Sequence, residues 1–509
     1  MLSPIQKEIV EQSGNLIVRA SAGTGKTHTM VAKIVHDIEH QHTHKGIAAI
    51  TFTIKAANEI KERLKIDTSN HFIGTNNSFV IEEIIKPFMK DAYGMEYKKL
   101  DMNTDYSVKV NTFSEGVKKI KDEQVLCSYK DNKKNFIFQL ALYILLNSRA
   151  CQLYLQAKYF KIYVDEYQDC DKDMHKFFMY ICSALKIDTF VVGDEKQSIY
   201  TWRGAYPEAF MEIWYRQDFS KKFLRDNFRS CQQIQNYSNL LCNETRGLYK
   251  CVEDLSSIIM VCATTDNWVS LIAPYLDLKK KCALLRYSNA NAELGADELT
   301  KGNIEFTYVP QTPIADITTN TAWLYNAVAK YFILQKYSVY DIRDEIPNEV
   351  VGDKKVLNYI KKTLSILDEC IKKEDLPEFK KQIELLVNYF GYEAKDDHCE
   401  RLYRTIYDKR YHSAFNIDDL TRIAITIHSS KGLEFEQVIM FVSDYRLSSG
   451  QDIYNHYVAV TRAKSKLIMV YIKGDKNANQ FEKKINSILA ESNLKMSSVA
   501  TIVPPINSQ

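Results

Sequence analysis

The chain has no closely spaced cysteine pairs and no long apolar run, and these two absences exclude several classes of protein. None of its 11 cysteines belongs to a C-x-x-C pair, so a zinc or iron–sulfur site is not expected. Free thiols of this kind are typical of a reducing cytoplasm. The most apolar stretch, from Phe136 to Leu146, is far shorter than the roughly 20 residues that cross a membrane. We interpret it as a buried helix and expect no membrane association.

An excess of one charge is also missing. The 67 basic and 64 acidic residues leave a net charge of +3, so a nucleic-acid surface would have to be a local groove. Residues 1–18 lack the basic start and apolar core of a secretory signal, which favours a cytoplasmic protein. A length of 509 residues predicts about three to four domain-sized units. Residues 497–509 are predicted to be a frayed polar tail.

What the chain does contain begins with a phosphate-binding pattern near the N-terminus. An apolar run, residues 16–18, leads into a stretch that matches G-x-x-x-x-G-K-[ST] except at Ala20. A strand, a glycine turn and a helix opened by Lys and Thr form the arrangement that binds a nucleotide triphosphate. We expect Lys26 to reach the β and γ oxygens and the Thr27 hydroxyl to hold Mg²⁺. The backbone N–H groups that would face the phosphates belong to Ser21, Ala22, Gly23, Thr24 and Gly25.

Two carboxylates at the end of a second apolar run fit the other half of such a site. Residues 161–164 are predicted to form a strand, and Asp165 and Glu166 follow it. A carboxylate at a strand tip can hold Mg²⁺, and its neighbour can accept a proton from an attacking water. We assign the first role to Asp165 and the second to Glu166. An isolated Asp-Glu would more often be an ordinary acidic turn, so the assignment depends on the residues around it.

The order of motifs along the chain resembles that of the superfamily 1 helicases of the UvrD/Rep type, from residue 2 to about residue 470. Residues 164–169 (Val-Asp-Glu-Tyr-Gln-Asp) resemble motif II, and residues 190–204 resemble motif III. Gln6 matches the adenine-reading glutamine near the N-terminus of the family. The other matches are residues 51–57 for motif Ia, 224–230 for motif IV, 426–435 for motif V and 457–464 for motif VI.

The resemblance implies which further residues meet the nucleotide. Arg229 and Arg462 would reach the γ-phosphate across a cleft from a second motor domain. Arginine suits this role because its planar fork is always charged and can bind two oxygens. Gln197 would contact the γ-phosphate from the first domain, and Glu434 would touch the ribose. Phe228, where the family usually has Tyr, completes the predicted ATP site. Taken alone, both arginines would more often be surface residues.

The resemblance also implies a path for single-stranded DNA. Three aromatic residues match base-stacking positions of the family, where each ring contributes about 1–3 kcal/mol. Beside them Arg203 can contact the backbone or a base, and Lys431 of motif V belongs to the same path. In place of a Thr-Phe-His-like run the chain has Thr75 and Asn77, and Asn cannot carry the charge of a protonated His. The three aromatic residues are Phe52, Tyr200 and Trp202. The alternative is that these side chains belong to the hydrophobic core, and this alternative applies more to Phe52 than to Trp202.

By the same resemblance the fold is α/β, with two RecA-like motor domains that have parallel sheets and a mainly helical insertion each. We expect the first motor domain at residues 1–87 and 159–220, with its helical insertion at 88–158. The second is expected at 221–312 and 417–509, with its insertion at 313–416. In the second insertion a helix between Asp353 and Lys373 has an apolar face. Its opposite face carries Lys354, Lys355, Lys361, Lys362, Lys372 and Lys373. This face is either simply solvated or a surface for duplex DNA or a partner.

Taken together, the resemblance implies an ATP-driven, Mg²⁺-dependent helicase or translocase that moves 3′ to 5′ on single-stranded and partially duplex DNA, in DNA repair or anti-phage defence. The alternative is a DNA-sensing regulatory ATPase that controls a separate nuclease subunit and unwinds little by itself. The compact size is similar to that of the helicase subunit of Gabija-type anti-phage systems, which pairs with a nuclease. An ATPase unrelated to nucleic acid would be favoured only if single-stranded DNA failed to stimulate hydrolysis.

Overall fold

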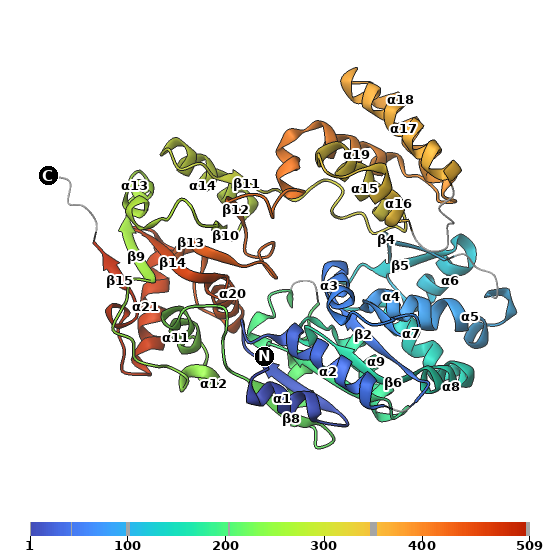
Figure 1. Cartoon of the computed structure of the whole chain (residues 1–509), viewed down its shortest axis with the longest axis horizontal. Coiled ribbons are helices and arrows are strands. Elements are labelled where there is room, and N and C mark those ends of the chain that lie inside the picture. The colour runs from blue at the N-terminus through green and yellow to red at the C-terminus, as the bar shows by residue number, and fades with distance from the viewer. Residues whose placement is uncertain (1, 42, 98–101, 202–203, 347–353, 505–509) are drawn as a thin grey trace.

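Two parallel β-sheets, each covered by helices, form the two lobes of the molecule (Figure 1). The computed structural model describes residues 2–41, 43–97, 102–201, 204–346 and 354–504. We call the sheet that contains β1, with its helices, the first lobe, and the sheet that contains β9, with its helices, the second lobe. The predicted α/β fold class is confirmed.

The first sheet has the strand order β3-β2-β6-β7-β1-β8, and all its neighbours are parallel. Its strands are β1 (Leu16–Ala20), β2 (Gly46–Thr51), β3 (Phe72–Thr75), β6 (Tyr159–Val164), β7 (Asp188–Gly193) and β8 (Ser220–Leu224). Successive residues of β1 point to opposite faces, so Leu16 and Val18 pack in one hydrophobic cluster and Ile17 packs in another. β1 is buried along its whole length, whereas β8 at the edge of the sheet begins with Ser220, Lys221 and Lys222 and is only partly buried.

The second sheet has the order β11-β12-β10-β13-β14-β9-β15. Its strands are β9 (Ile258–Ala263), β10 (Cys282–Arg286), β11 (Thr307–Tyr308), β12 (Arg422–Thr426), β13 (Phe435–Phe441), β14 (Ala463–Ile472) and β15 (Thr501–Val503). The prediction of a frayed tail from residue 497 is wrong for its first part. β15 pairs with β9, and Val499 and Ala500 are buried in the core of the second lobe. The three residues of β15, Thr501, Ile502 and Val503, are all β-branched, which explains the strand.

Helices connect and cover the strands, as parallel sheets require. Those of the first lobe are α1 (Pro4–Glu11), α2 (Lys26–His40), α3 (Ile54–Leu64), α4 (Asn76–Val80), α9 (Lys172–Ser183) and α10 (Glu208–Tyr215). Those of the second lobe are α11 (Gln232–Leu240), α12 (Asn243–Arg246), α13 (Trp268–Ile272), α14 (Asn289–Lys301), α20 (Gly450–Val460) and α21 (Lys476–Ala490). β8 pairs with β1 and ends at Leu224, slightly beyond the domain boundary expected at residue 220. The boundaries themselves stay predictions.

The expected first insertion contains helices and also a strand pair that the sequence analysis did not foresee. Its helices are α5 (Lys86–Tyr93), α6 (Phe113–Glu123), α7 (Phe136–Asn147) and α8 (Arg149–Lys158). β4 (Asn103–Val110) and β5 (Val125–Tyr129) pair in parallel, joined by α6. Among the described residues no single helix is long and apolar enough to span a membrane, and the one bent pair that passes by length and composition is α7 with α8.

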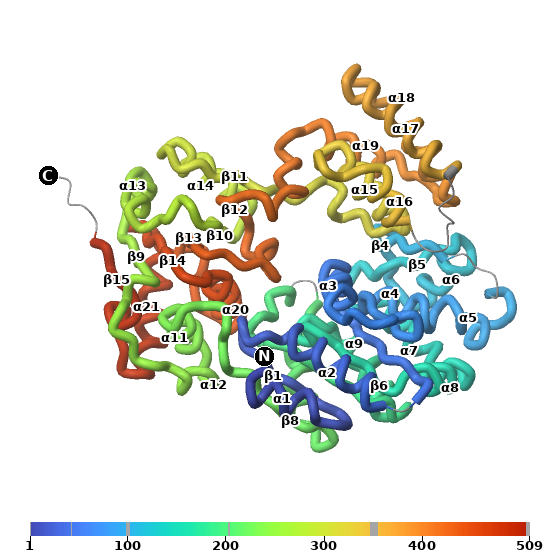
Figure 2. The backbone as a smooth tube through the Cα atoms, viewed as in Figure 1, coloured from blue at the N-terminus to red at the C-terminus, as the bar shows by residue number. Residues whose placement is uncertain are grey.

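The expected second insertion is helical and has a hydrophobic cluster of its own. It contains α15 (Ala322–Ile333), α16 (Val339–Asp344), α17 (Lys354–Lys372), α18 (Leu376–Tyr389) and α19 (Asp396–Tyr407). It lies beside β4 of the first insertion (Figure 2), where the Thr104 hydroxyl donates to Asn320 Oδ1 at 2.7 Å and Lys395 pairs with Asp105. The two insertions therefore touch, although they belong to different lobes.

The apolar and basic faces of α17 lie as the sequence predicts. Ile360, Leu364 and Leu367 are buried, and the lysines whose side chains are described, Lys355, Lys361, Lys362, Lys372 and Lys373, are exposed. The basic face is partly neutralised by its own helix. Lys372 lies 2.5 Å from Asp368 and Lys373 lies 3.3 Å from Glu369. These pairs favour the interpretation of a solvated face.

Candidate functional site

The phosphate-binding pattern forms the turn between β1 and α2. Gly23 and Gly25 have φ angles of +76° and +78°, a region that residues with a Cβ rarely adopt. A Cβ on Gly23 would also come within 2.3 Å of Asn227 Oδ1. Gly25 is the N-cap of α2 and offers no side-chain cap. The first N–H groups of α2 are thus left for an anion at the helix N-terminus.

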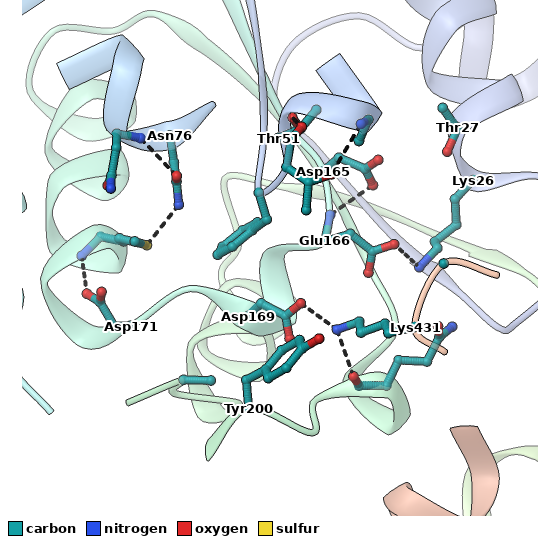
Figure 3. A pocket seen from close by; sticks show the side chains of 18 of the residues that line it. Lys26, Thr27, Thr51, Asn76, Asp165, Glu166, Asp169, Asp171, Tyr200 and Lys431 are labelled. Carbon is teal, nitrogen blue, oxygen red and sulfur yellow. Dashed lines mark hydrogen bonds and ion pairs between the residues drawn. The ribbon is translucent and has the colours of Figure 1, made fainter. Parts of the chain in front are cut away.

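The two predicted carboxylates follow β6, next to the phosphate loop (Figure 3). Lys26 Nζ lies 2.9 Å from Glu166 Oε1, and Asp165 Oδ1 accepts a hydrogen bond from the Glu166 N–H at 2.8 Å. Glu166 has a left-handed φ of +49°, a strained conformation that is common in functional sites. The structure thus brings Lys26, Asp165 and Glu166 together, as predicted.

Burial and charge act differently on the two carboxylates. Burial, and then the negative charge of Glu166, raise the pKa of Asp165. Burial would also raise the pKa of Glu166, but the ammonium groups of Lys26 and Lys431 outweigh it and lower this pKa. The positive charge of Lys26 is therefore the main factor that lowers the pKa of Glu166 and makes it a weaker base.

Oxygen donors near the phosphate loop fit the predicted Mg²⁺. Asp165 offers a carboxylate and Thr27 a hydroxyl, and both line the same cavity. In the part of the chain that the structure describes, no three His, Cys, Asp or Glu side chains gather into a metal site. Such a cluster is not needed, because Mg²⁺ commonly binds through one or two protein oxygens together with the phosphates of a nucleotide.

The second lobe brings both predicted arginines to this cavity. Arg462 follows α20, and its Nη2 donates to Gln197 Oε1 of the first lobe at 3.3 Å. Burial, and then the charge of Arg229, lower the pKa of Arg462 to about 10. Arg229 is paired with Glu434 at 2.5 Å, and Lys464 lies 3.3 Å from the same carboxylate. Arg229 and Glu434, both predicted to meet ATP, therefore form an ion pair with each other.

Gln6, predicted to read adenine, and Phe228, predicted as part of the ATP site, flank the phosphate loop. Gln6 Nε2 donates to the Thr24 carbonyl at 3.3 Å, and Gln6 Oε1 accepts from the Ser3 N–H at 2.9 Å. The Phe228 N–H donates to the Gly23 carbonyl at 2.9 Å, and its side chain is 65% exposed. A flat ring held beside the loop and open to solvent suits stacking against a base.

The cavity continues from the phosphate loop into the region predicted for DNA. Its volume is about 1260 Å³. Figure 3 shows Lys26 and Thr27 at one end and Asn76 and Asp171 at the other. Four predicted DNA contacts, Phe52, Asn77, Tyr200 and Lys431, line it. Phe52 also packs against the first-lobe core, so both interpretations of this ring remain open.

The surroundings of Thr75 and Asn77, two of the predicted DNA contacts, differ. Thr75 caps α4, where its Oγ1 accepts from the Ser78 N–H at 3.2 Å. Asn77 Nδ2 donates to the Tyr106 hydroxyl at 3.1 Å. Trp202 and Arg203 lie outside the described residues.

The Lys431 side chain points toward Asp169, and its Nζ lies 4.9 Å from the centre of the Tyr200 ring (Figure 3). Its Nζ lies 2.5 Å from Asp169 Oδ2 and donates to the Gln197 carbonyl at 3.0 Å (Figure 3). Both partners belong to the first lobe, so Lys431 connects the two lobes. Burial raises the pKa of Asp169 to about 6, although the Lys431 charge opposes the shift.

Tyr457 is a residue at this interface that sequence reasoning missed. Its hydroxyl accepts from the Ala22 N–H at 3.1 Å and donates to Asp194 Oδ2 at 3.2 Å. Lys196, also buried, lies 2.7 Å from Asp194 Oδ1. The only signal in the sequence was position, since Tyr457 begins the segment that resembles motif VI and Lys196 lies within motif III.

Comparisons with known proteins agree with this geometry. The UvrD/REP helicase N-terminal domain matches residues 2–135 and 78–219, and the UvrD-like helicase C-terminal domain matches residues 423–470. The chain is 40% identical to Gabija protein GajB of Bacillus cereus over 479 residues, which cover 91% of the chain and 94% of that relative.

More distant relatives carry helicase names. A probable DNA helicase II homolog of Mycoplasma capricolum is 25% identical over 90% of the chain and 82% of its own length. The ATP-dependent DNA helicase PcrA of Bacillus subtilis is 29% identical over 47% of the chain and 39% of its own length. From the matched domains and the full-length relative, the chain belongs to the UvrD/Rep family of helicases.

Proposed function

We propose that the protein hydrolyses ATP with Mg²⁺ in the cleft between its lobes and uses the energy to move 3′ to 5′ along single-stranded DNA. One observation carries the proposal. Lys26, Asp165 and Glu166 of the first lobe share a cavity with Arg229 and Arg462 of the second. Groups of opposite lobes that must meet one phosphate make hydrolysis depend on the position of the lobes.

Nucleotide binding would begin with an exchange of partners. Lys26 would leave Glu166 for the β- and γ-phosphate oxygens. Since Lys26 holds down the pKa of Glu166, this move would make Glu166 a stronger base. Glu166 would then orient the attacking water and take its proton. Mg²⁺, held by Thr27 and Asp165, would neutralise phosphate charge when bound.

The second lobe would complete the site as the cleft closes. Arg229 would leave Glu434, and Arg462 would turn from Gln197, so that both guanidinium groups meet the γ-phosphate. Glu434, once released, would be free to contact the ribose. Arginines delivered in this way contribute a factor of about 10³ or more in rate.

The DNA path would run along the cavity that also holds the nucleotide. Phe52 and Tyr200 would stack on bases, together with Trp202 and Arg203, and Asn77 would contact the strand backbone. We retain Lys431 in this path as a residue that reaches the strand when its pair with Asp169 opens. Thr75 would act by positioning α4, which it caps.

Strand separation on tailed duplexes tests the direction of movement. A duplex with a 3′ single-stranded tail should be unwound in the presence of Mg²⁺ and ATP, and a duplex with a 5′ tail should not. Lys26→Ala, which removes the phosphate contact, should unwind neither. Preferential unwinding of the 5′-tailed duplex would overturn the proposed polarity.

A second candidate function is favoured by the near full-length similarity to Gabija protein GajB. In this alternative the chain is a DNA-sensing ATPase of the cytoplasm that controls a separate nuclease subunit in anti-phage defence. The test is to purify the chain with its native partners and to measure cleavage of DNA by the complex. Cleavage that requires wild-type Lys26 would support the alternative, whereas cleavage unaffected by Lys26→Ala would contradict it.

A further inference from the structure

The second lobe carries two rings at the carboxyl edge of its sheet that are not among the predicted DNA contacts. Tyr287 directly follows β10, and His428 follows the neighbouring strand β12. The two strands leave the sheet together, because the Ile427 N–H donates to the Arg286 carbonyl at 2.9 Å. The rings therefore lie edge to face, with centroids 5.9 Å apart and an interplanar angle of 71°.

These rings continue a series that starts in the first lobe. The Tyr200 ring lies 6.0 Å from the His428 ring, and the Tyr200 hydroxyl donates to the His428 carbonyl at 3.3 Å. Tyr200 also lines the cavity together with Phe52. Tyr200, His428 and Tyr287 thus form successive ring contacts that pass from one lobe to the other.

Tyr287 has an exposed ring on a fixed backbone. Its side chain is 52% exposed. Its N–H donates to Asp444 Oδ2 at 3.1 Å, and the same carboxylate oxygen accepts from Arg286 Nε at 2.7 Å. A ring that is already oriented loses little freedom when it stacks, so it suits a flat ligand such as a base.

We propose that Tyr287 is a base-stacking residue of the second lobe for single-stranded DNA. The inference rests on the proposed function and extends the strand beyond Tyr200. An uncharged ring binds any base, as a motor that ignores sequence requires. With Tyr200 on one lobe and Tyr287 on the other, each lobe contacts the strand separately. Closure of the cleft would change the distance between these two contacts.

Affinity for a fluorescent single-stranded oligonucleotide tests the proposal. Tyr287→Ala should weaken binding by roughly 5- to 150-fold, the loss expected for one stacked base. Tyr287→Phe keeps the ring and should stay within about twofold of wild type. Since no phosphate contact is lost, the dependence of affinity on salt should keep its slope in both variants. The matched control is Tyr215→Ala, on α10 and 70% exposed, which should bind as wild type.

Two binding results would overturn the proposal. Tyr287→Ala binding as tightly as wild type, while Tyr200→Ala binds weakly, would mean that the strand does not reach this ring. Equal losses in the Phe and Ala variants would assign the effect to the hydroxyl. A wild-type protein that binds no single-stranded DNA would instead reject the proposed function itself. Photo-cross-linking of unmutated protein to an iodouracil-substituted strand checks the contact independently, and no cross-linked peptide containing Tyr287 would also overturn it.

Discussion

The ammonium group of Lys26 lies against Glu166 where a phosphate would otherwise bind, and Arg229 lies against Glu434 in the same way. Two of the three cations predicted to meet ATP, Lys26 and Arg229, thus have a carboxylate partner, whereas Arg462 contacts the Gln197 amide. Removing such a carboxylate should free its cation for phosphate. A substitution at such a carboxylate should therefore affect ATP hydrolysis and ATP binding differently.

Glu166→Gln should separate them most clearly. The amide cannot take a proton, so the ATP hydrolysis rate should fall by about 10²-fold or more. Lys26 loses its charged partner, so ATP should bind at least as tightly as in wild type. The measurements are steady-state phosphate release and binding of a fluorescent ATP analogue.

Glu59→Gln is the control for this substitution, because Glu59 lines the same cavity but pairs with Arg63. It should hydrolyse ATP at the wild-type rate. Near-normal turnover by Glu166→Gln would remove Glu166 from the catalytic role.

His456 predicts a loss of stability in acid. It is fully buried in α20, its Nε2 lies within hydrogen-bond distance of the Tyr237 hydroxyl at 2.9 Å, and burial lowers its pKa to about 3. In the unfolded chain the imidazole takes up a proton near its usual value of 6.5. This part of the stability is therefore present above about pH 6.5 and is lost as pH falls toward 3, by at most about 1.4 kcal/mol per pH unit.

Urea unfolding at several pH values between about 5 and 7 measures this slope. His456→Gln should flatten it, whereas His44→Gln, at an exposed position, should leave it unchanged. A slope that survives in His456→Gln would assign the acid sensitivity to other groups.

At the scale of elements, the residues that lead into β15 belong to the core of the second lobe. Val499 is 3% exposed and Ile502 is 43% exposed. Gln233 Nε2 donates to the Val499 carbonyl at 2.8 Å, which fixes this segment against α11. The two apolar residues therefore offer a matched pair of buried and exposed positions.

The same substitution at both positions should have different effects on unfolding. Val499→Asp buries a carboxylate without a partner and should cost about 2 kcal/mol or more, and Ile502→Asp should cost much less. Thermal unfolding of the two variants measures the difference. Equal melting temperatures would mean that residues 499–503 are not packed as described.

The lysines of α17 lead to a prediction of no effect. Lys361 lies 5.1 Å from the centre of the Tyr340 ring, and Lys372 and Lys373 have acidic partners one turn away. Reversal of Lys355 and Lys362 to Glu should change the unfolding free energy by under about 0.5 kcal/mol each and leave unwinding intact. Melting and strand-separation assays check this. Impaired unwinding at an unchanged melting temperature would identify a working surface instead.

Local patterns predicted the elements and the site better than they predicted contacts between distant segments. The strand before Ser21, the glycine turn and the strand before Asp165 depend on short-range preferences, so the sequence alone was sufficient for them. The β4–β5 pair was missed because parallel strands joined by a helix leave no turn signal between them. The expected tail was assigned from polarity, and the apolar residues Val499, Ile502 and Val503 within it were overlooked.

Contacts between lobes could not be read from sequence because they depend on how two folded units are placed. Nothing in the motif order shows that Lys431 meets Asp169 or that the Tyr457 hydroxyl reaches the phosphate loop. The contact of Thr104 with Asn320 joins segments that lie far apart in the chain. The family resemblance indicated which residues matter, and the structure adds which of them hold one another.

For the whole molecule, the lobes meet around the nucleotide site and again where the two insertions touch. Around the site the polar contacts include Lys431 with Asp169, Arg462 with Gln197 and Tyr457 with Ala22. Ala22 and Ile199 of the first lobe also pack in the hydrophobic cluster of the second lobe. Polar contacts of this kind can exchange partners without exposing apolar surface. In the proposed function, ATP would replace polar partners such as these as the lobes move relative to each other.

The most direct test of this account is the rate of phosphate release from ATP, with Mg²⁺ present, as single-stranded DNA is added to the purified protein. The account predicts a rate that rises with DNA to a plateau in wild type. It also predicts a much lower plateau in Arg462→Lys, which keeps the charge but loses the planar fork. A wild-type rate that is the same with and without DNA would contradict the claim that the cleft couples hydrolysis to a DNA strand.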